Sequence, residues 1–277
     1  MPTNSNNDTI KNPEKTASTR RHISTQRKDS PMKVLKNFVS VDWRSGRDRI
    51  YFFFKDDNTY SLFDIGDDAT PDEYPTPVNY DNWHTFHKHV KHLRFGFTTT
   101  DIENEPSGGL DQDFLWLFYY EGSTPMVCKY DQDTDKVIRN YRVDSSVWHT
   151  LLPYFDRIVA GVWWRTYAPG IKGKFRFLMN DGNSLFLDLN LPQRRAHFNE
   201  GIHELELKPI TNTTWPGLQP YKHRIISAAQ NDRTFADSYL YIFLTDNEYV
   251  TYNIPEDKLA HGLKKIDDHT WPGLLRD

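Results

Sequence analysis

A histidine-rich segment is the part of this sequence whose residue types and spacing most directly suggest chemistry. Four histidines fall within nine residues, namely His84, His87, His89 and His92. Neutral imidazoles this close together can ligate zinc, nickel, copper or haem iron. The same segment carries Lys88 and Lys91, and it has no nearby carboxylate to orient the imidazoles. The segment is therefore either a metal or haem site, or a polar connection between structured elements.

Two charged residues lie in otherwise apolar runs, where they could hold an ion. Asp42 lies in a run that ends at Trp43, and its carboxylate could bind a cation together with backbone carbonyl oxygens. Alternatively, Asp42 pairs with Arg44 or Arg47, and the sequence favours this ion pair. Arg94 could likewise receive an anion or pair with an acid of its own repeat.

Large aromatic residues follow two of the predicted strands and are candidates for ligand contacts. These residues are Trp43, Trp163, Trp164 and Tyr167. An exposed ring beside polar loop residues can hold a sugar, a polyamine or another flat ligand. Large aromatic side chains also pack between sheets, and the sequence favours that interpretation.

No motif in the sequence indicates a known catalytic mechanism. It contains no nucleophile elbow, phosphate-binding loop, dinucleotide fingerprint or zinc-protease helix. We therefore expect a binding protein rather than an enzyme. The alternatives are an enzyme that needs no such motif, for example a cyclase with a shaped cavity, and a protein–protein interaction module.

The composition predicts an all-β protein of the cytoplasm. Aromatic residues make up 14% of the chain and methionine only four residues, which favours strands over helices. The single cysteine, Cys128, cannot form an intramolecular disulfide and is expected to be buried. No apolar run is long enough to span a membrane, and the first thirty residues lack the apolar stretch of a secretory signal.

The first 35 residues differ from the rest of the chain in charge and in polarity. They hold seven lysines and arginines against three acids, a net charge of +4, so the remaining residues carry −8 of the total of −4. Ser, Thr, Asn and Pro dominate this arm, and it has no aromatic residue. We expect a disordered basic arm over residues 1–35, and the lack of aromatics does not favour nucleic-acid binding.

Four repeats organise the remaining residues. They end at Trp83, Trp148, Trp215 and Trp271, which are 65, 67 and 56 residues apart, and each tryptophan follows a polar turn. An aromatic-rich run, a polar turn and an alternating run precede each tryptophan, which predicts a β-hairpin. The predicted hairpins span residues 49–64, 114–131, 174–188 and 239–253, and a further short strand opens each repeat at 39–43, 93–97, 158–162 and 226–230.

Three clear strands and a weaker fourth, repeated four times, predict a closed four-bladed β-propeller. The predicted blades span about residues 36–89, 90–156, 157–223 and 224–277. The opening strands would line a narrow channel, where their edge groups must find ions, water or ligand. Small residues at the fourth position of these strands, Gly96, Gly161 and Ala229, fit such crowding, and Asp42 takes the same place in the first blade.

The repeat tails carry a family resemblance. Trp215-Pro216-Gly217-Leu218 leads into an Ile-Ser-Ala-Ala strand, and Trp271-Pro272-Gly273-Leu274 repeats the tail. With the aromatic hairpin, this pattern resembles the hemopexin-like repeat family over residues 36–277. The resemblance implies a four-bladed propeller that binds haem, a polyamine, a metal ion or a glycan, with a cation in the channel. Where the family's opening strand usually has Asp, this chain has Ser40, Arg94, Val159 and Ser227.

Together these patterns predict a non-enzymatic, hemopexin-like propeller that binds a small ligand at the channel mouth or on the blade faces. The predicted ligand contacts are Trp43, Arg94, Trp163, Trp164 and Tyr167, and the predicted metal ligands are Asp42, His84, His87, His89 and His92. The cofactor is left open between a channel cation and haem. The oligomeric state does not follow from the sequence.

Overall fold

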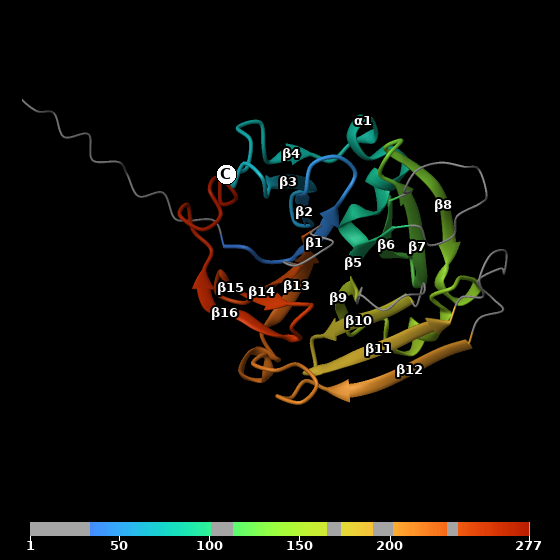
Figure 1. Cartoon of the computed structure of the whole chain (residues 1–277). Helices are drawn as coiled ribbons and strands as arrows, with labels where there is room; N and C mark the ends of the chain where they lie inside the picture. The colour runs from blue at the N-terminus through green and yellow to red at the C-terminus, as the bar shows by residue number, and fades with distance from the viewer. Residues whose placement is uncertain (1–33, 101–112, 165–172, 191–201, 232–237, 277) are drawn as a thin grey trace, which may run out of the picture. The chain divides into compact units, whose positions relative to one another are not determined.

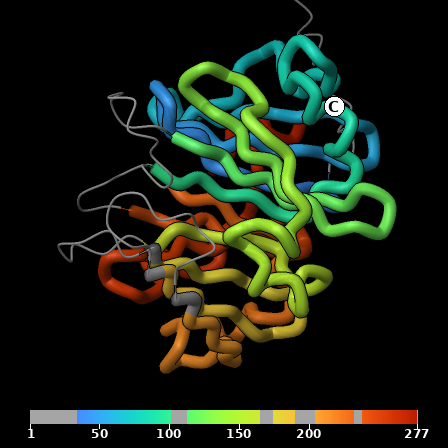
Figure 2. The backbone as a smooth tube through the Cα atoms, turned by 90° about the vertical axis from the view of Figure 1, so that its right-hand side faces the viewer, coloured from blue at the N-terminus to red at the C-terminus, as the bar shows by residue number. Residues whose placement is uncertain are grey.

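Four antiparallel sheets of four strands each make up the part of the chain that the structure describes. The structure is a computed structural model that describes residues 34–100, 113–164, 173–190, 202–231 and 238–276. In the view of Figure 1, the first strand of each sheet lies nearest a common centre, and the following strands lie progressively farther out in chain order. Figure 2 shows the second sheet (green) from outside, between the first (blue) and the third (yellow).

Each of the four sheets forms one blade of four consecutive strands. Blade 1 holds β1 (Phe38–Trp43), β2 (Arg49–Phe54), β3 (Thr59–Asp64) and β4 (Thr76–Pro77). Blade 2 holds β5 (Leu93–Thr100), β6 (Asp113–Glu121), β7 (Thr124–Asp131) and β8 (Lys136–Arg142). Blade 3 holds β9 (Ile158–Trp163), β10 (Gly173–Met179), β11 (Asn183–Asn190) and β12 (Ile202–Pro209). Blade 4 holds β13 (Ile225–Gln230), β14 (Tyr239–Leu244), β15 (Glu248–Asn253) and β16 (Lys258–Lys265).

The innermost strands close into a ring. β1 contacts β5 and β13, and β9 contacts the same two strands from the other side. Each inner strand therefore has a neighbour from the blade before it and one from the blade after it. The fold is a four-bladed β-propeller, as the repeats predict.

Short helical segments join the blades. A single helical turn, α1 (Tyr80–Trp83), is capped by the Asn79 side chain, which accepts hydrogen bonds from the backbone of Asp81 and Asn82. The histidine-rich residues His84–His92 follow as a 3₁₀ segment that leads into β5. Further 3₁₀ segments span Val143–Ser145, His149–Tyr154 and Gln219–Tyr221. No helix among the described residues is long and apolar enough to cross a membrane.

The four repeat tryptophans lie between neighbouring blades and hold them together. Each one contacts a residue at the same position in the second strand of its own blade. The distances from the tryptophan ring are 5.2 Å for Trp83 to Tyr51, 5.3 Å for Trp148 to Trp116, 5.4 Å for Trp215 to the Arg176 guanidinium and 5.4 Å for Trp271 to Tyr241. Three of them also pack, in tilted or edge-on geometry, against an aromatic ring in the third strand of the next blade, at Tyr130, Tyr252 and Phe63.

The seam between blades 4 and 1 closes the ring without a disulfide. Trp271 packs on Phe52 and Phe63 of blade 1, and Leu274 and Leu275 are buried in the same cluster. The Thr70 backbone N–H of blade 1 donates to the Pro272 carbonyl at 2.9 Å. Leu35, which the sequence assigned to the basic arm, is also buried in this cluster. Both ends of the described chain therefore take part in closure.

The hydrogen-bond ladders change one detail of the predicted alignment. Tyr51, Trp116 and Arg176 occupy one position in their blades, and the residues next to them pair with Ser40, Gly96 and Gly161. Ser40, rather than Asp42, is therefore the blade 1 counterpart of Gly96 and Gly161, and Ala228, rather than Ala229, is their counterpart in blade 4. The crowding itself is present, because a Cβ at Gly161 would lie 2.5 Å from the Phe97 ring and one at Gly96 would lie 2.8 Å from Val41.

We predict that a chain ending at Asp268 is much less stable than the full chain. It lacks Trp271, Leu274 and Leu275, whose burial at about 25 cal/mol per Å² contributes several kcal/mol. Urea denaturation should show this loss as a lower midpoint, whereas a control chain ending at Leu275 should keep nearly the full stability. A truncated protein that melts within about a degree or two of the full chain would show that this seam does not close the propeller.

Candidate functional site

One end of the channel is occupied by side chains from all four blades. The strand ladders place Asp42, Thr98, Trp163 and Gln230 at equivalent positions, near the carboxyl ends of the four inner strands. The Thr98 backbone N–H donates to Asp42 Oδ1 at 3.0 Å, and the Thr98 hydroxyl donates to the Asp42 carbonyl at 2.8 Å. These bonds pair edge groups of β1 with edge groups of β5 that have no partner within their own sheets.

Arg44 lies at the centre of this group, which we call the channel network. Its Nε donates to Asp42 Oδ2 at 3.0 Å, and its Nη2 donates to Gln230 Oε1 at 3.2 Å. Its guanidinium carbon lies 5.6 Å from the centre of the Trp163 ring. Both side chains of the ion pair are nearly inaccessible, with 5% of Arg44 and 3% of Asp42 exposed. The expected pairing of Asp42 with Arg44 is therefore present.

Gln132 connects blade 2 to the channel network. Its Oε1 accepts the Arg44 backbone N–H at 2.8 Å, and its Nε2 donates to the Thr98 hydroxyl at 2.9 Å. Both oxygens of the Asp42 carboxylate accept a hydrogen bond within the protein, one from Thr98 and one from Arg44. Cation binding at Asp42 stays a prediction.

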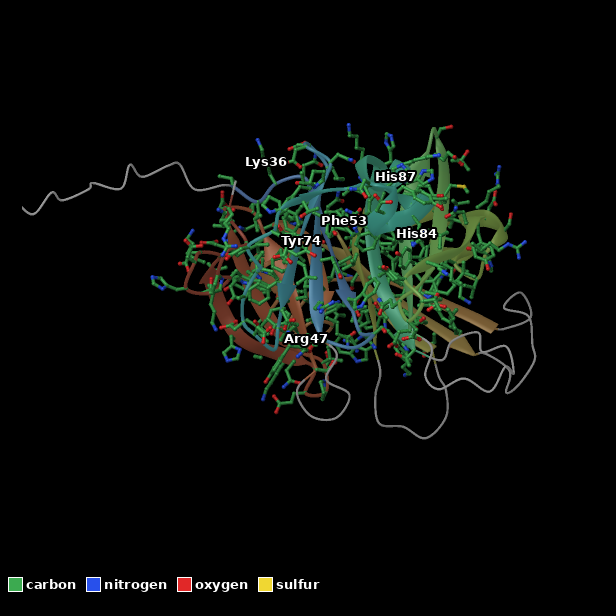
Figure 3. All side chains as sticks on the ribbon, turned by 90° about the horizontal axis from the view of Figure 1, so that it is seen from above. Lys36, Arg47, Phe53, Tyr74, His84 and His87 are labelled. Atoms are coloured by element: carbon green, nitrogen blue, oxygen red, sulfur yellow. The ribbon has the colours of Figure 1, made fainter. Side chains whose placement is uncertain are left out.

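The predicted histidine site lies at the other end of the inner strands. His84 precedes β5, whereas Arg47 follows β1, and Figure 3 shows His87 and Arg47 on opposite sides of the propeller. His87 bonds to the His84 carbonyl through Nδ1, and His89 stacks on Tyr119 at 4.3 Å. Burial lowers the pKa of His89 below its ordinary value. No group of three His, Cys, Asp or Glu side chains converges within the described ranges, so metal or haem binding here stays a prediction.

The predicted aromatic contacts are separated by the fold. Trp43 packs on Trp83 and Tyr130 between blades 1 and 2, and Trp164 packs on Trp215 between blades 3 and 4. Trp163 lies in the channel network, and Tyr167 falls outside the described residues. All three described tryptophans are buried, as the packing interpretation requires.

A hollow of about 250 Å³ lies on blade 3 over the row Arg176, Phe186 and Glu206. Arg176 lies 3.6 Å from the Trp164 ring centre and forms an ion pair with Asp257 of blade 4 at 2.9 Å. Its charge and its flat face are therefore both used within the protein.

A second hollow of about 250 Å³ lies at the seam between blades 4 and 1, and we call it the seam hollow. Its residues include Tyr239, Tyr241, Thr251, His261 and Lys264 of blade 4, and Phe63 and Asp68 of blade 1. Tyr241, Thr251 and His261 pair across three strands, so their side chains form one row on the same face of the sheet. This row is the blade 4 counterpart of the charged row on blade 3, and Trp271 lies below it.

One replaced residue distinguishes the seam hollow from two other seams. At two other seams, a tyrosine hydroxyl in the third strand donates to an aspartate in the following turn. The distances are 2.6 Å for Tyr130 to Asp135 and 2.8 Å for Tyr252 to Asp257. Blade 1 has Phe63 at the equivalent position, which has no hydroxyl to donate to Asp68. The Asp68 carboxylate is exposed at the rim of the seam hollow.

Tyr249 is a neutral hydrogen-bonding group of the seam hollow. Burial raises its pKa, the neighbouring Trp271 side chain opposes this, and the negative charges of Asp267 and Asp68 raise the pKa further. Its hydroxyl therefore keeps its proton at physiological pH. Tyr239 and Tyr241 are half-buried, so part of each side chain remains accessible.

Sequence reasoning did not single out the residues of the seam hollow. The alternation of Tyr239, Tyr241 and Phe243 was visible as a strand pattern, and it places these side chains on one face. The position of Asp68 beside that face depends on ring closure, which brings the first and last repeats together.

Comparison with known proteins does not assign the chain to a family. No model of a known protein family matches the sequence, and no curated protein matches it. The fold is shown by the four blades themselves, and membership of the hemopexin-like repeat family stays a prediction.

We predict that Arg44→Ala strongly destabilises the propeller. Removing one partner of a buried ion pair leaves an uncompensated charge and costs about 3–5 kcal/mol. Asp42→Ala should cost a similar amount, and the double variant should lose clearly less than the two single losses added together. The free energies of unfolding are measured by urea titration.

The control for this experiment is an exposed ion pair. Arg142 and Asp144 bind each other at 2.6 Å on the surface, and Arg142→Ala should hardly move the unfolding midpoint. Additive effects of the Arg44 and Asp42 changes would show that the channel network is not coupled.

Proposed function

We propose that this protein is a non-enzymatic ligand-binding propeller of the hemopexin-like kind, and that it binds a sugar ring of a glycan in the seam hollow. The observation that supports this function is the row of Tyr241, Thr251 and His261, which runs beside Tyr239 above Trp271. Half-buried tyrosines present an apolar ring with a polar tip, which is the combination that a sugar needs. The apolar C–H face of the sugar lies on a ring, and its hydroxyls bond to the tips.

The charges at the rim favour a neutral ligand. Asp68 and Lys264 have opposite charges and both are exposed, so neither a cation nor an anion is attracted by the rim as a whole. A polyamine would be repelled by Lys264. A polyhydroxylated ring can use both groups, because a carboxylate accepts hydrogen bonds from hydroxyls and an ammonium donates to them.

The volume of the seam hollow favours a small ligand. At about 250 Å³ it is just below the range of roughly 300–1,000 Å³ that is typical of drug-sized ligands. A single sugar ring fits such a space, whereas the much larger haem does not. The residues that line the hollow also offer His261 as the one imidazole, which is too few for a metal site.

We predict that Tyr241→Ala weakens sugar binding by about tenfold. Losing one aromatic contact removes on the order of 1 kcal/mol, and 1.4 kcal/mol corresponds to a factor of ten. Binding is measured by saturation-transfer NMR and calorimetry, with a panel of neutral monosaccharides and their methyl glycosides as probes.

Tyr80→Ala is the matched control, because Tyr80 is an exposed tyrosine of α1 at a different seam. This variant should bind as the unchanged protein does, and thermal unfolding should confirm that both variants are folded. If no neutral sugar binds the unchanged protein, or if Tyr241→Ala binds equally well, glycan binding at the seam hollow is wrong.

A further inference from the structure

Two positively charged residues lie near the seam between blades 1 and 2, at the end of the inner strands away from Arg44. Lys55 directly follows β2, and Arg94 is the second residue of β5. Lys55 Nζ donates to the Leu93 carbonyl at 3.4 Å, so its ammonium group contacts the backbone of blade 2 directly before Arg94. Each side chain as a whole is only partly buried.

Arg94 has a nitrogen that lacks a hydrogen-bond partner. Its Nη2 donates to the Asp156 backbone carbonyl at 2.6 Å, whereas its Nε is buried and has no partner among the described residues. A buried donor without an acceptor destabilises the folded state, and a charged donor does so more strongly. An acceptor bound there would remove this cost.

Carboxylates near this pair are bonded elsewhere. Asp56 accepts a hydrogen bond from Asn37 Nδ2 at 2.5 Å, and the Asp156 carboxylate accepts one from the Tyr120 hydroxyl. Within the described residues, neither Lys55 nor Arg94 forms an ion pair with an acid. Burial lowers the pKa of Lys55 and the positive charge of Arg94 lowers it further, with Asp56 opposing them. The two cations are therefore close enough to repel each other.

Arginines beside other inner strands differ in this respect. Arg157, which precedes β9, binds Asp181 at 2.7 Å. Arg224, which precedes β13, pairs with Glu248, and Glu248 also binds Lys265 at 2.7 Å. The seams beside blades 3 and 4 thus neutralise their cations with ion pairs within this chain, whereas neither Lys55 nor Arg94 forms such a pair among the described residues.

We propose that Lys55 and Arg94 form a binding site for a phosphate-type oxyanion. A guanidinium N–H and an ammonium group are the donors that phosphate oxygens accept in charge-assisted hydrogen bonds. In this proposal the anion accepts from Arg94 Nε and Lys55 Nζ and forms the ion pair that these two cations do not form with a described carboxylate. This site is independent of the seam hollow, which lies between blades 4 and 1.

The test is a titration of the full chain with inorganic phosphate, followed by thermal unfolding and by calorimetry. Sodium chloride at matched ionic strength corrects for general screening. We expect phosphate to raise the melting temperature beyond the chloride control, because a ligand that binds the folded state stabilises it. Lys55→Gln and Arg94→Gln should each weaken phosphate affinity at least tenfold.

Lys36→Gln is the matched control, since Lys36 is an exposed cation on the same side of the propeller (Figure 3). It should bind phosphate as the unchanged protein does. A second variant, Lys55→Met, should remain folded because it removes one of two repelling charges, and it should bind phosphate no better than Lys55→Gln. Glycerol phosphate is a further probe: tighter binding than inorganic phosphate indicates a phosphorylated small molecule, and weaker binding indicates free phosphate.

Two results would overturn the proposal. One is a melting temperature that responds to phosphate no more than to chloride. The other is an equal loss of affinity in Lys36→Gln and Arg94→Gln, which would reveal only a general attraction of anions to this face. Failure of sugar binding at the seam hollow would leave this experiment unaffected.

Discussion

The packing of one tryptophan into each seam is the interaction on which the rest of this structure depends. A blade has two faces to bury, and a large flat side chain between neighbouring blades covers both at once. The indole N–H groups of Trp83, Trp148, Trp215 and Trp271 have no hydrogen-bond partner among the described residues. Aromatic rings surround them, so dispersion and the interaction of ring edges with ring faces hold the seams together. Ring packing at the same position of each repeat, rather than hydrogen bonding of the indole N–H, holds these tryptophans in place.

Closure of the ring by the tryptophan seams brings the edges of the four inner strands together at the centre. Four inner strands expose edge N–H and C=O groups toward one another, and each group needs a partner. Ser40 and Ser227 meet this need between blades 1 and 4, and Arg44 with Asp42 meets it across the channel. Because blade 1 alone supplies this buried ion pair, the centre of a repetitive fold is asymmetric.

Asymmetry among the repeats also accounts for both proposed sites. Phe63 stands where blades 2 and 4 have a tyrosine, so Asp68 lacks the tyrosine hydroxyl that donates to Asp135 and Asp257. Arg94 lacks the carboxylate partner that Arg157 and Arg224 have. In each case the backbone of the blade is the same as in the other repeats, and one different side chain removes an interaction that the other repeats make.

Sequence alone determined the blade plan, because the tryptophan spacing and the hairpin patterns are local signals that survive in every repeat. It also favoured the Asp42–Arg44 pair and the packing role of Trp43, Trp163 and Trp164, since neighbouring charges and large aromatics have few other uses in a propeller. The alignment of Asp42 with Gly96 was wrong, because the pairing partners in the second strands, which the sequence does not show, place Ser40 at that position. The tertiary structure alone brought Asp68 to Tyr241 and Lys55 to Arg94. These pairs are distant in the chain, and only closure of the ring and packing of one blade on the next make them neighbours.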